Sequence, residues 1–194
     1  MTSSFFKPVI NLFVYIFILT LFITCIFPII DLEGKDFIYS DSEFLWPLPG
    51  YSYISSYFGY RNSPTAGASS YHSGIDIPSP SGTTIYAVCS GTVTFASWGA
   101  GGGYTIVVQN EELGLSFSYC HVSPIFIVSR GQTVYKGEAI STVGPKNVYG
   151  INDNPYKDSN GQPTNGATTG CHLHLTIKKD GQAVNPLNYV SIPN

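Results

Sequence analysis

Charged residues are scarce in this 194-residue chain, because Asp, Glu, Lys and Arg together make up only 11% of it. Lys7 and Lys35 stand before Trp46 together with five acidic residues, which leaves seven basic and seven acidic residues from Trp46 onward. The main body is therefore neutral, and no stretch of it gathers Lys and Arg. Nucleic-acid binding depends on a basic patch that faces phosphates, so the sequence predicts no nucleic-acid partner.

Helical periodicity is also missing from residue 46 onward. Short runs rich in β-branched and aromatic residues alternate with turn residues, which predicts an all-β fold. The length suits one domain with a real core. We expect two hairpins, one that joins residues 83–88 to 92–96 around Ser90-Gly91 and one that joins residues 104–109 to 115–122. Residues 134–143, interrupted by Gly137, and residues 172–178 complete the set, and Asp180-Gly181 forms a turn after the last strand.

One long uncharged and strongly apolar stretch covers residues 8–30 and is almost entirely Leu, Ile, Phe and Val. A membrane-spanning helix needs about 20 such residues. The stretch is longer than the roughly 7–15 residues of a signal-peptide core, and no Ala-x-Ala-like cleavage site follows it. We predict a cytoplasmic tail (residues 1–7), one transmembrane helix (8–30), an acidic linker (31–45) and a folded domain (46–194). Lys7 lies before the helix and mostly acidic residues follow it, which favours a folded domain outside the cytoplasm.

Cysteine is too infrequent for a disulfide framework, because the predicted exported part contains only Cys89, Cys120 and Cys171. Cys120 and Cys171 each precede a histidine, so strand alternation predicts that both point away from the histidine face. A bridge between them and a role as small buried hydrophobes are both compatible with this pattern.

Histidine occurs only four times, and all four residues lie in short β-like motifs. In residues 169–177 the strand period of two places His172, His174 and Thr176 on one face. His72 and Asp76 are separated by an even number and share a face in the same way. The fourth histidine is His121. Taken alone, the strand at residue 172 is equally compatible with two solvent-facing polar residues.

Zinc in catalytic sites takes imidazole and carboxylate ligands, usually three from the protein, and leaves one position for water. His72, Asp76 and one histidine of the His172/His174 pair would supply these three, and strand parity does not say which one. The remaining two histidines would be free for proton transfer and for stabilising an oxyanion. The pattern therefore predicts hydrolysis of a polarised carbonyl.

The ordered motifs resemble the M23 (LytM/lysostaphin-like) zinc endopeptidases of bacterial cell walls. They are His72-x3-Asp76, Tyr119-x-His121 and His172-x-His174, and the likeness extends over most of residues 46–186. The resemblance implies an antiparallel β-sheet core with a groove walled by loops. It also implies that His72, Asp76 and His174 hold one Zn²⁺, that His121 and His172 are catalytic, and that Arg61 lies near the groove. The implied substrate is the stem or cross-bridge peptide of peptidoglycan, and the implied place is the extracytoplasmic side of a bacterial cell membrane.

Two departures from that family stand out. Cys171 replaces the usual Pro before the histidine pair, and residues 145–167 are longer than the usual connection. We expect the long segment to wall the groove and set substrate preference, and the run Ala100-Gly101-Gly102-Gly103 to be a mobile loop. One alternative is a catalytically silent LytM-type scaffold or activator of another hydrolase, although all five site positions are present. A lipoyl- or biotinyl-type carrier domain is disfavoured, since no lysine sits at a suitable hairpin tip. The oligomeric state stays open.

Overall fold

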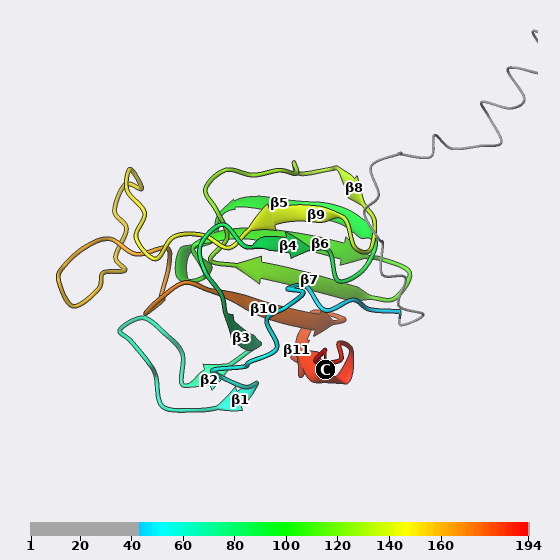
Figure 1. Ribbon diagram of the computed structural model, residues 1–194, viewed down its shortest axis with the longest axis horizontal. Coiled ribbons are helices and arrows are strands. Elements are labelled where there is room, and N and C mark those ends of the chain that lie inside the picture. Colours follow the sequence, from blue (N-terminus) through cyan, green and yellow to red (C-terminus); the bar gives the residue numbers. More distant parts are fainter. Residues whose placement is uncertain (1–42, 194) are drawn as a thin grey trace, which may run out of the picture. The chain divides into compact units, whose positions relative to one another are not determined.

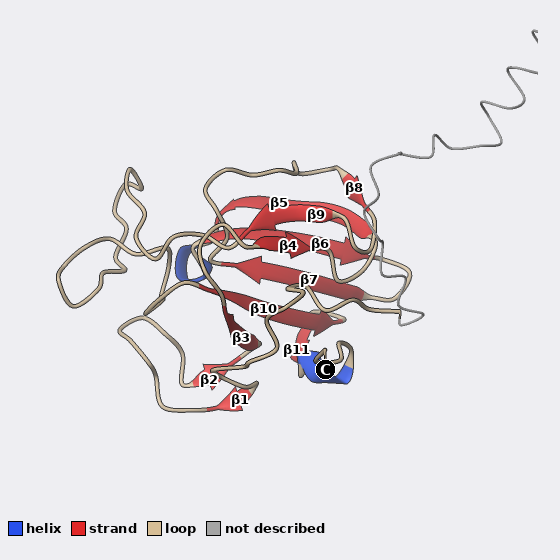
Figure 2. Cartoon of the chain, viewed as in Figure 1, coloured by secondary structure: helices blue, strands red, loops and turns tan. Residues whose placement is uncertain are grey.

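The computed structural model describes residues 43–193. The predicted tail, the predicted transmembrane helix at residues 8–30 and most of the predicted linker lie outside this range. Within residues 43–193, no helix is long and apolar enough to cross a bilayer. Every strand pair in this range is antiparallel, and the helical elements are two three-residue 3₁₀ turns (Figures 1 and 2). The all-β antiparallel prediction is confirmed for the described part of the chain.

The strands and 3₁₀ helices follow one another in short elements along the chain. They are β1 (Gly59–Tyr60), β2 (Tyr71–His72), β3 (Ile75–Pro78), β4 (Thr84–Tyr86), β5 (Gly91–Trp98), η1 (Ala100–Gly102), β6 (Tyr104–Asn110), β7 (Leu115–Cys120), β8 (Thr133–Val134), β9 (Ala139–Thr142), β10 (His172–Lys179), β11 (Gln182–Val184) and η2 (Pro186–Asn188). A seven-stranded sheet has the order β11-β10-β7-β6-β5-β8, and β3 pairs with β10 beside that path. Two small sheets, β1-β2 and β4-β9, complete the fold.

The two faces of the large sheet differ in chemistry. On β10, Leu173, Leu175 and Ile177 are fully buried, and on β7 Phe117 and Tyr119 are fully buried beside them. These side chains form one core cluster with residues of β3, β4, β6 and β9. Side chains alternate along a strand, so the opposite face of β10 carries its polar residues. The apolar face therefore holds the fold together, and the polar face is available for a site.

The predicted hairpin between residues 104–109 and 115–122 is confirmed as β6 and β7, which pair from Ile106 with Tyr119 to Asn110 with Leu115. The predicted strand at residues 172–178 is β10. The turn at Asp180-Gly181 joins it to β11, and both turn residues have positive φ, 48° and 80°, as a tight two-residue hairpin turn requires.

The predicted hairpin between residues 83–88 and 92–96 is wrong. β4 pairs with β9, whereas β5 pairs with β6 and β8. The backbone between the two strands is engaged elsewhere, because the Val88 carbonyl accepts from the Leu45 N–H at 2.8 Å and the Val88 N–H donates to the Tyr119 hydroxyl at 2.8 Å. Gly91 is needed for a close approach rather than a turn, since a Cβ there would lie 2.4 Å from the carbonyl oxygen of Gln109.

Two predicted loop boundaries also change. The run of residues 100–103, predicted as a mobile loop, contains the 3₁₀ helix η1, whose Gly102 carbonyl accepts from the His121 N–H at 2.7 Å. At the N-terminal side, the Phe44 ring lies 5.9 Å from that of Phe117, so the folded part includes the end of the predicted linker.

Candidate metal centre and catalytic groove

Three side chains from three strands converge at one end of the polar sheet face. His72 comes from β2, Asp76 from β3 and His174 from β10, where His174 pairs with Asp76 across the strands. The distances between their ligand atoms are 2.8 Å from His174 Nδ1 to Asp76 Oδ1, 3.1 Å from His72 Nε2 to Asp76 Oδ1, and 2.9 Å from His72 Nε2 to His174 Nδ1. One nitrogen from each imidazole and one carboxylate oxygen thus surround a single point.

In His72 and His174, the hydrogen-bond partner of the second ring nitrogen indicates which nitrogen carries the proton. His72 Nδ1 is 2.8 Å from the Tyr57 carbonyl oxygen, which can only accept, so this nitrogen carries the proton and His72 Nε2 is a bare lone pair. His174 Nε2 is 2.8 Å from the Thr176 hydroxyl, and a hydrogen bond from Nε2–H to this oxygen leaves Nδ1 bare. Two lone pairs and a carboxylate then face one another without a hydrogen between them. A cation is the group that fits such a set, and imidazole with carboxylate suits zinc.

The ionisation states fit the same conclusion. Burial alone would raise the pKa of Asp76, but the close imidazoles of His172, His174 and His72 outweigh it and hold that pKa below its usual range. Burial lowers the pKa of His174, and the attraction of Asp76 only partly opposes this. An ionised carboxylate and a neutral imidazole are the forms in which these groups bind metal.

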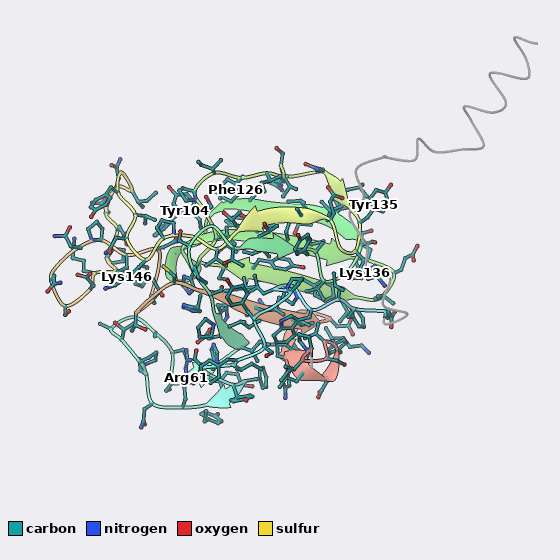
Figure 3. The ribbon with its side chains drawn as sticks, viewed as in Figure 1. Arg61, Tyr104, Phe126, Tyr135, Lys136 and Lys146 are labelled. Carbon is teal, nitrogen blue, oxygen red and sulfur yellow. The ribbon has the colours of Figure 1, made fainter. Side chains whose placement is uncertain are left out.

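Arg61 holds the second oxygen of the aspartate. Its Nη1 lies 3.0 Å from Asp76 Oδ2, and the same nitrogen hydrogen-bonds the Ser56 hydroxyl. Figure 3 shows Arg61 beside β1 and β2. The guanidinium therefore fixes the carboxylate so that Oδ1 faces the two histidines. The structure brings Arg61 to the site, as the resemblance implied, and gives it an orienting contact with a candidate ligand.

His172 and His121 lie beside the convergent set. His172 Nδ1 is 3.0 Å from the Gly170 carbonyl oxygen, and its Nε2 is 3.4 Å from Asp76 Oδ1. The ring centroids of His121 and His172 are 4.7 Å apart. His121 Nδ1 donates to the Asn165 carbonyl at 2.6 Å. In both rings Nδ1 therefore carries the proton, and in the neutral form Nε2 is free to accept one. All five residues singled out in the sequence come together at this site.

The pKa of His121 is lowered to about 3, chiefly by burial and then by the nearby His172 and His174. His121 therefore stays neutral at pH 7. A neutral, buried imidazole with a bare Nε2 has the form of a general base or of a hydrogen-bond acceptor for water. The geometry supports proton transfer chemistry next to a cation.

The sequence did not reveal Asn165 as a site residue. It is fully buried, its Oδ1 accepts from the Tyr104 N–H at 2.8 Å, and its Nδ2 donates to the Val122 carbonyl at 3.0 Å. These two side-chain bonds fix the backbone carbonyl that orients His121. Only the position of Asn165 near the end of the long segment hinted at this, because the segment leads into the histidine strand.

The prediction for Cys120 is wrong. Cys120 pairs with His174 across β7 and β10, so its side chain is on the histidine face. His121 has a positive φ of 58°, which breaks the strand alternation and turns its ring to the same side. Burial raises the pKa of the Cys120 thiol to about 11, so the thiol is protonated at neutral pH. Cys120 and Cys171 are both free thiols.

A groove of about 850 Å³ runs over these side chains. The loop that joins β1 to β2 lines it together with η1 and the residues before β10, namely Asn62, Pro64, Gly67, Ala68, Ser69, Gly101, Gly102, Ala167, Thr168, Thr169 and Gly170. Ser118, Thr176 and Lys178 extend the lining along β7 and β10. The predicted groove walled by loops is present, and all four histidines and Asp76 line it.

Comparison with known proteins identifies the family. The sequence model of peptidase family M23 matches residues 70–186, which is more than half of the chain and includes all five site residues. The chain belongs to peptidase family M23. This M23 domain is 33% identical over 143 residues to the DD-carboxypeptidase/endopeptidase Mpg of Neisseria meningitidis, a match that covers 74% of the chain and 28% of the relative. The chain thus corresponds to about a quarter of that protein's length.

Two further matches are one relative in sequence and one solved structure. Stage II sporulation protein Q of Bacillus subtilis is 34% identical over 122 residues, which cover 62% of the chain and 36% of that protein. A zinc containing peptidase from Vibrio cholerae has the same fold, with a TM-score of 0.58 and 23% identity over 76% of this chain and 40% of the other.

Proposed function

We propose that the protein is a membrane-anchored, zinc-dependent endopeptidase that hydrolyses peptide bonds in the stem or cross-bridge peptides of peptidoglycan. The observation that carries this proposal is the set of lone pairs formed by His72 Nε2, His174 Nδ1 and Asp76 Oδ1. A scaffold has no need for three metal-ligating atoms without a shared proton, flanked by two further imidazoles. Peptidoglycan as the substrate rests on membership of the M23 family.

In this proposal His72, Asp76 and His174 hold one zinc ion. When bound there, zinc polarises a carbonyl and lowers the pKa of a bound water from about 15.7 toward 7. Tyr57 and Thr176 fix the tautomers of the two histidine ligands, and Arg61 fixes the carboxylate. The protein thereby holds the ligand atoms in place before the metal arrives.

His121 and His172 supply the proton chemistry. Each has Nδ1 committed to a backbone carbonyl, so a neutral ring can only accept at Nε2. One ring takes a proton from the attacking water as its oxygen bonds to the carbonyl carbon, and this proton goes to the amide nitrogen when the C–N bond breaks. A ring that is protonated donates a hydrogen bond to the oxygen on which negative charge develops. The carbonyls of Asn165 and Gly170 keep both Nε2 atoms aimed at the groove throughout.

The anchor is part of the same proposal. Residues 8–30 carry no charge and are long enough to span a bilayer, and residues 46–194 would act outside the cytoplasm. Mass spectrometry of the membrane-extracted protein tests this directly. An intact N-terminus supports an anchor, and a mature chain that begins after residue 30 would show a cleaved signal in its place.

The enzymatic activity is tested by metal analysis and by mass spectrometry of peptidoglycan digests from Gram-positive and Gram-negative sources. We expect about one zinc per chain and new peptide ends in one type of sacculus. Tyr135→Ala is the control variant that should keep both zinc and activity. Tyr135 is 70% exposed and lies far from Arg61 and the site (Figure 3). Zinc-loaded protein that releases no peptide product from any source would count against the enzyme.

The second candidate is a catalytically silent LytM-type scaffold or activator. The observation in its favour is the 34% identity with stage II sporulation protein Q of B. subtilis. The two candidates differ in what the histidines do. A scaffold keeps its partner binding when His121 and His172 are replaced, whereas a peptidase loses turnover.

A further inference from the structure

The long insertion at residues 145–167 does not form the groove wall that we predicted from the sequence. Of this range only Ala167 lines the groove, and the other walls come from the loop between β1 and β2, from η1 and from the residues just before β10. Substrate preference therefore has to come from residues outside the insertion that do line the groove.

The polar face of β10 carries four lining side chains at every second residue. His172, His174, Thr176 and Lys178 share this face by strand alternation, and all four line the groove. Lys178 is the last of them and is exposed. It pairs with Ser116 of β7, the strand beside β10 in Figure 1. The groove therefore extends along β10 from the candidate metal centre to a lysine.

Charge is sparse in the groove and unequally committed. Apart from the histidines, the charged residues of its lining are Arg61, Asp76 and Lys178. Arg61 and Asp76 form an ion pair at 3.0 Å. Within residues 43–193, Lys178 forms no ion pair with a carboxylate. The groove thus presents one positive charge that no described residue neutralises.

The charge of Lys178 acts on the groove side of the strand. Burial raises the pKa of the Cys120 thiol to about 11, and the positive charge of Lys178 is one of the weaker influences that oppose this. Cys120 lines the groove and pairs with His174 across the strands. The field of the ammonium therefore reaches the space in which a substrate would lie.

The distance from the candidate centre to Lys178 follows from strand geometry. Lys178 is four residues beyond His174 on β10. At about 3.3 Å per residue, the two positions are about 13 Å apart. An extended peptide advances by about 3.3–3.6 Å per residue, so about four residues of a bound peptide cover the same distance.

We propose that Lys178 determines specificity by binding a carboxylate that the substrate carries about three to five residues from the scissile bond, on one side only. This inference rests on the proposed function, and it deepens it by naming the charge and the position of a group on the preferred substrate. An ammonium offers three N–H donors and a full positive charge, which suit a carboxylate. Beyond Arg61, the lining residues from the loop between β1 and β2 and from η1 carry no charge, so they provide no second site for an anion.

The test uses pairs of synthetic peptides built on one core peptide that the enzyme cleaves in the digests. The members of a pair differ only in a Glu or a Gln at one position, which is moved residue by residue away from the scissile bond on either side. At low ionic strength we expect kcat/KM to be about two- to fivefold higher for the Glu peptide, at positions on one side only. In 1 M salt, where the Debye length is about 3 Å, this ratio should approach one.

Two substitutions separate a charge contact from a structural role. Lys178→Gln should bring the Glu/Gln ratio of kcat/KM to about one, and Lys178→Glu should invert it. A structural defect would slow both peptides alike and would not invert their order. The matched controls are Lys179→Gln and Lys179→Glu, because Lys179 is also exposed on β10 but does not line the groove. They change the net charge equally and should keep the wild-type ratio.

Equal cleavage of both members of every pair by the wild type at low ionic strength would overturn the inference. A wild-type ratio in Lys178→Glu, or Lys179 variants that change the ratio as much as the Lys178 variants do, would overturn it as well. In each of these results the peptidase stays active, so they are distinct from failure of the proposed function. Absence of zinc binding together with absence of any cleaved peptide would refute the peptidase, and the role of Lys178 with it.

Discussion

Thr176 offers the sharpest test of how the candidate zinc ligands are held. Its hydroxyl lies 2.8 Å from His174 Nε2, and its side chain is only 5% exposed. It is two residues beyond His174 on β10, on the same face of the strand. Thr176→Val keeps the shape of the side chain and removes the oxygen that accepts the His174 proton.

The magnitude follows from what the hydroxyl does. Groups that orient a metal-binding histidine typically contribute 10- to 100-fold in metal affinity, which corresponds to about 1.4–2.7 kcal/mol. An independent estimate comes from the buried Nε2–H, which would lose its acceptor at a cost of about 1–3 kcal/mol. The two ranges overlap. In the valine variant, His174 can also carry its proton on Nδ1. That proton would point at Asp76, and Nδ1 could then not bind a metal ion.

The assay is a competition titration of zinc against a chromophoric chelator at fixed pH. Thr176→Val should bind zinc 10- to 100-fold more weakly, whereas Thr176→Ser, which restores the hydroxyl, should bind it nearly as the wild type does. Ser141→Ala is the control for loss of a buried hydroxyl, because Ser141 is fully buried in β9 and away from the site. Wild-type zinc affinity in Thr176→Val would refute the claim that this hydrogen bond fixes the ligand.

Three further predictions concern the same chain. His174→Ala should lose both zinc and hydrolysis, while His172→Ala and His121→Ala should keep zinc and lose roughly 10²–10⁴-fold in the rate of hydrolysis. Metal analysis and turnover measurements on the three variants check this. Loss of zinc from His172→Ala together with retention of zinc in His174→Ala would reverse the ligand assignment. Tyr119→Phe should lower the free energy of unfolding by about 1–3 kcal/mol, because the buried Val88 N–H loses its acceptor; urea denaturation measures this, and an unchanged midpoint would refute it. The pKa of His121 is lowered to about 3 in the folded protein, so between about pH 6.5 and 3 the unfolded chain binds a proton that the folded chain does not. The metal-free protein should therefore lose stability as the pH falls below about 6.5, by at most about 1.4 kcal/mol per pH unit from this group, and His121→Asn should flatten the slope of urea midpoint against pH.

The arrangement of the histidines on β10 was predictable, because alternation along a strand is a local property. His172, His174 and Thr176 share a face once the residues around them are recognised as a strand. The same rule failed at Cys120. Its neighbour His121 lies just beyond the end of β7 with a φ of 58°, and nothing in the sequence signals that a histidine will adopt a conformation rare for residues other than glycine.

The pairing of β4 and β5 was not predictable for a different reason. Ser90-Gly91 between two β-rich runs has the composition of a hairpin turn, and local composition favours pairing of sequence neighbours. The structure pairs β4 with β9, more than fifty residues later, and fills the space near Val88 with the Tyr119 hydroxyl. Long-range packing decides this choice, and a single sequence carries no record of it.

The four imidazoles of the site are all oriented by a hydrogen bond from one ring nitrogen, and one of these hydrogen bonds links the insertion to the site. Each ring commits one nitrogen to a fixed oxygen: the carbonyls of Tyr57, Gly170 and Asn165 for three rings, and the Thr176 hydroxyl for the fourth. Three of these acceptors are backbone atoms in loops, so for these three rings loop position sets the protonation pattern and side-chain identity does not. An insertion can then lengthen between Gly144 and Asn165 without disturbing the reaction, provided that its two ends meet. The hydrogen bond from Asn165 N–H to the Lys146 carbonyl satisfies that condition.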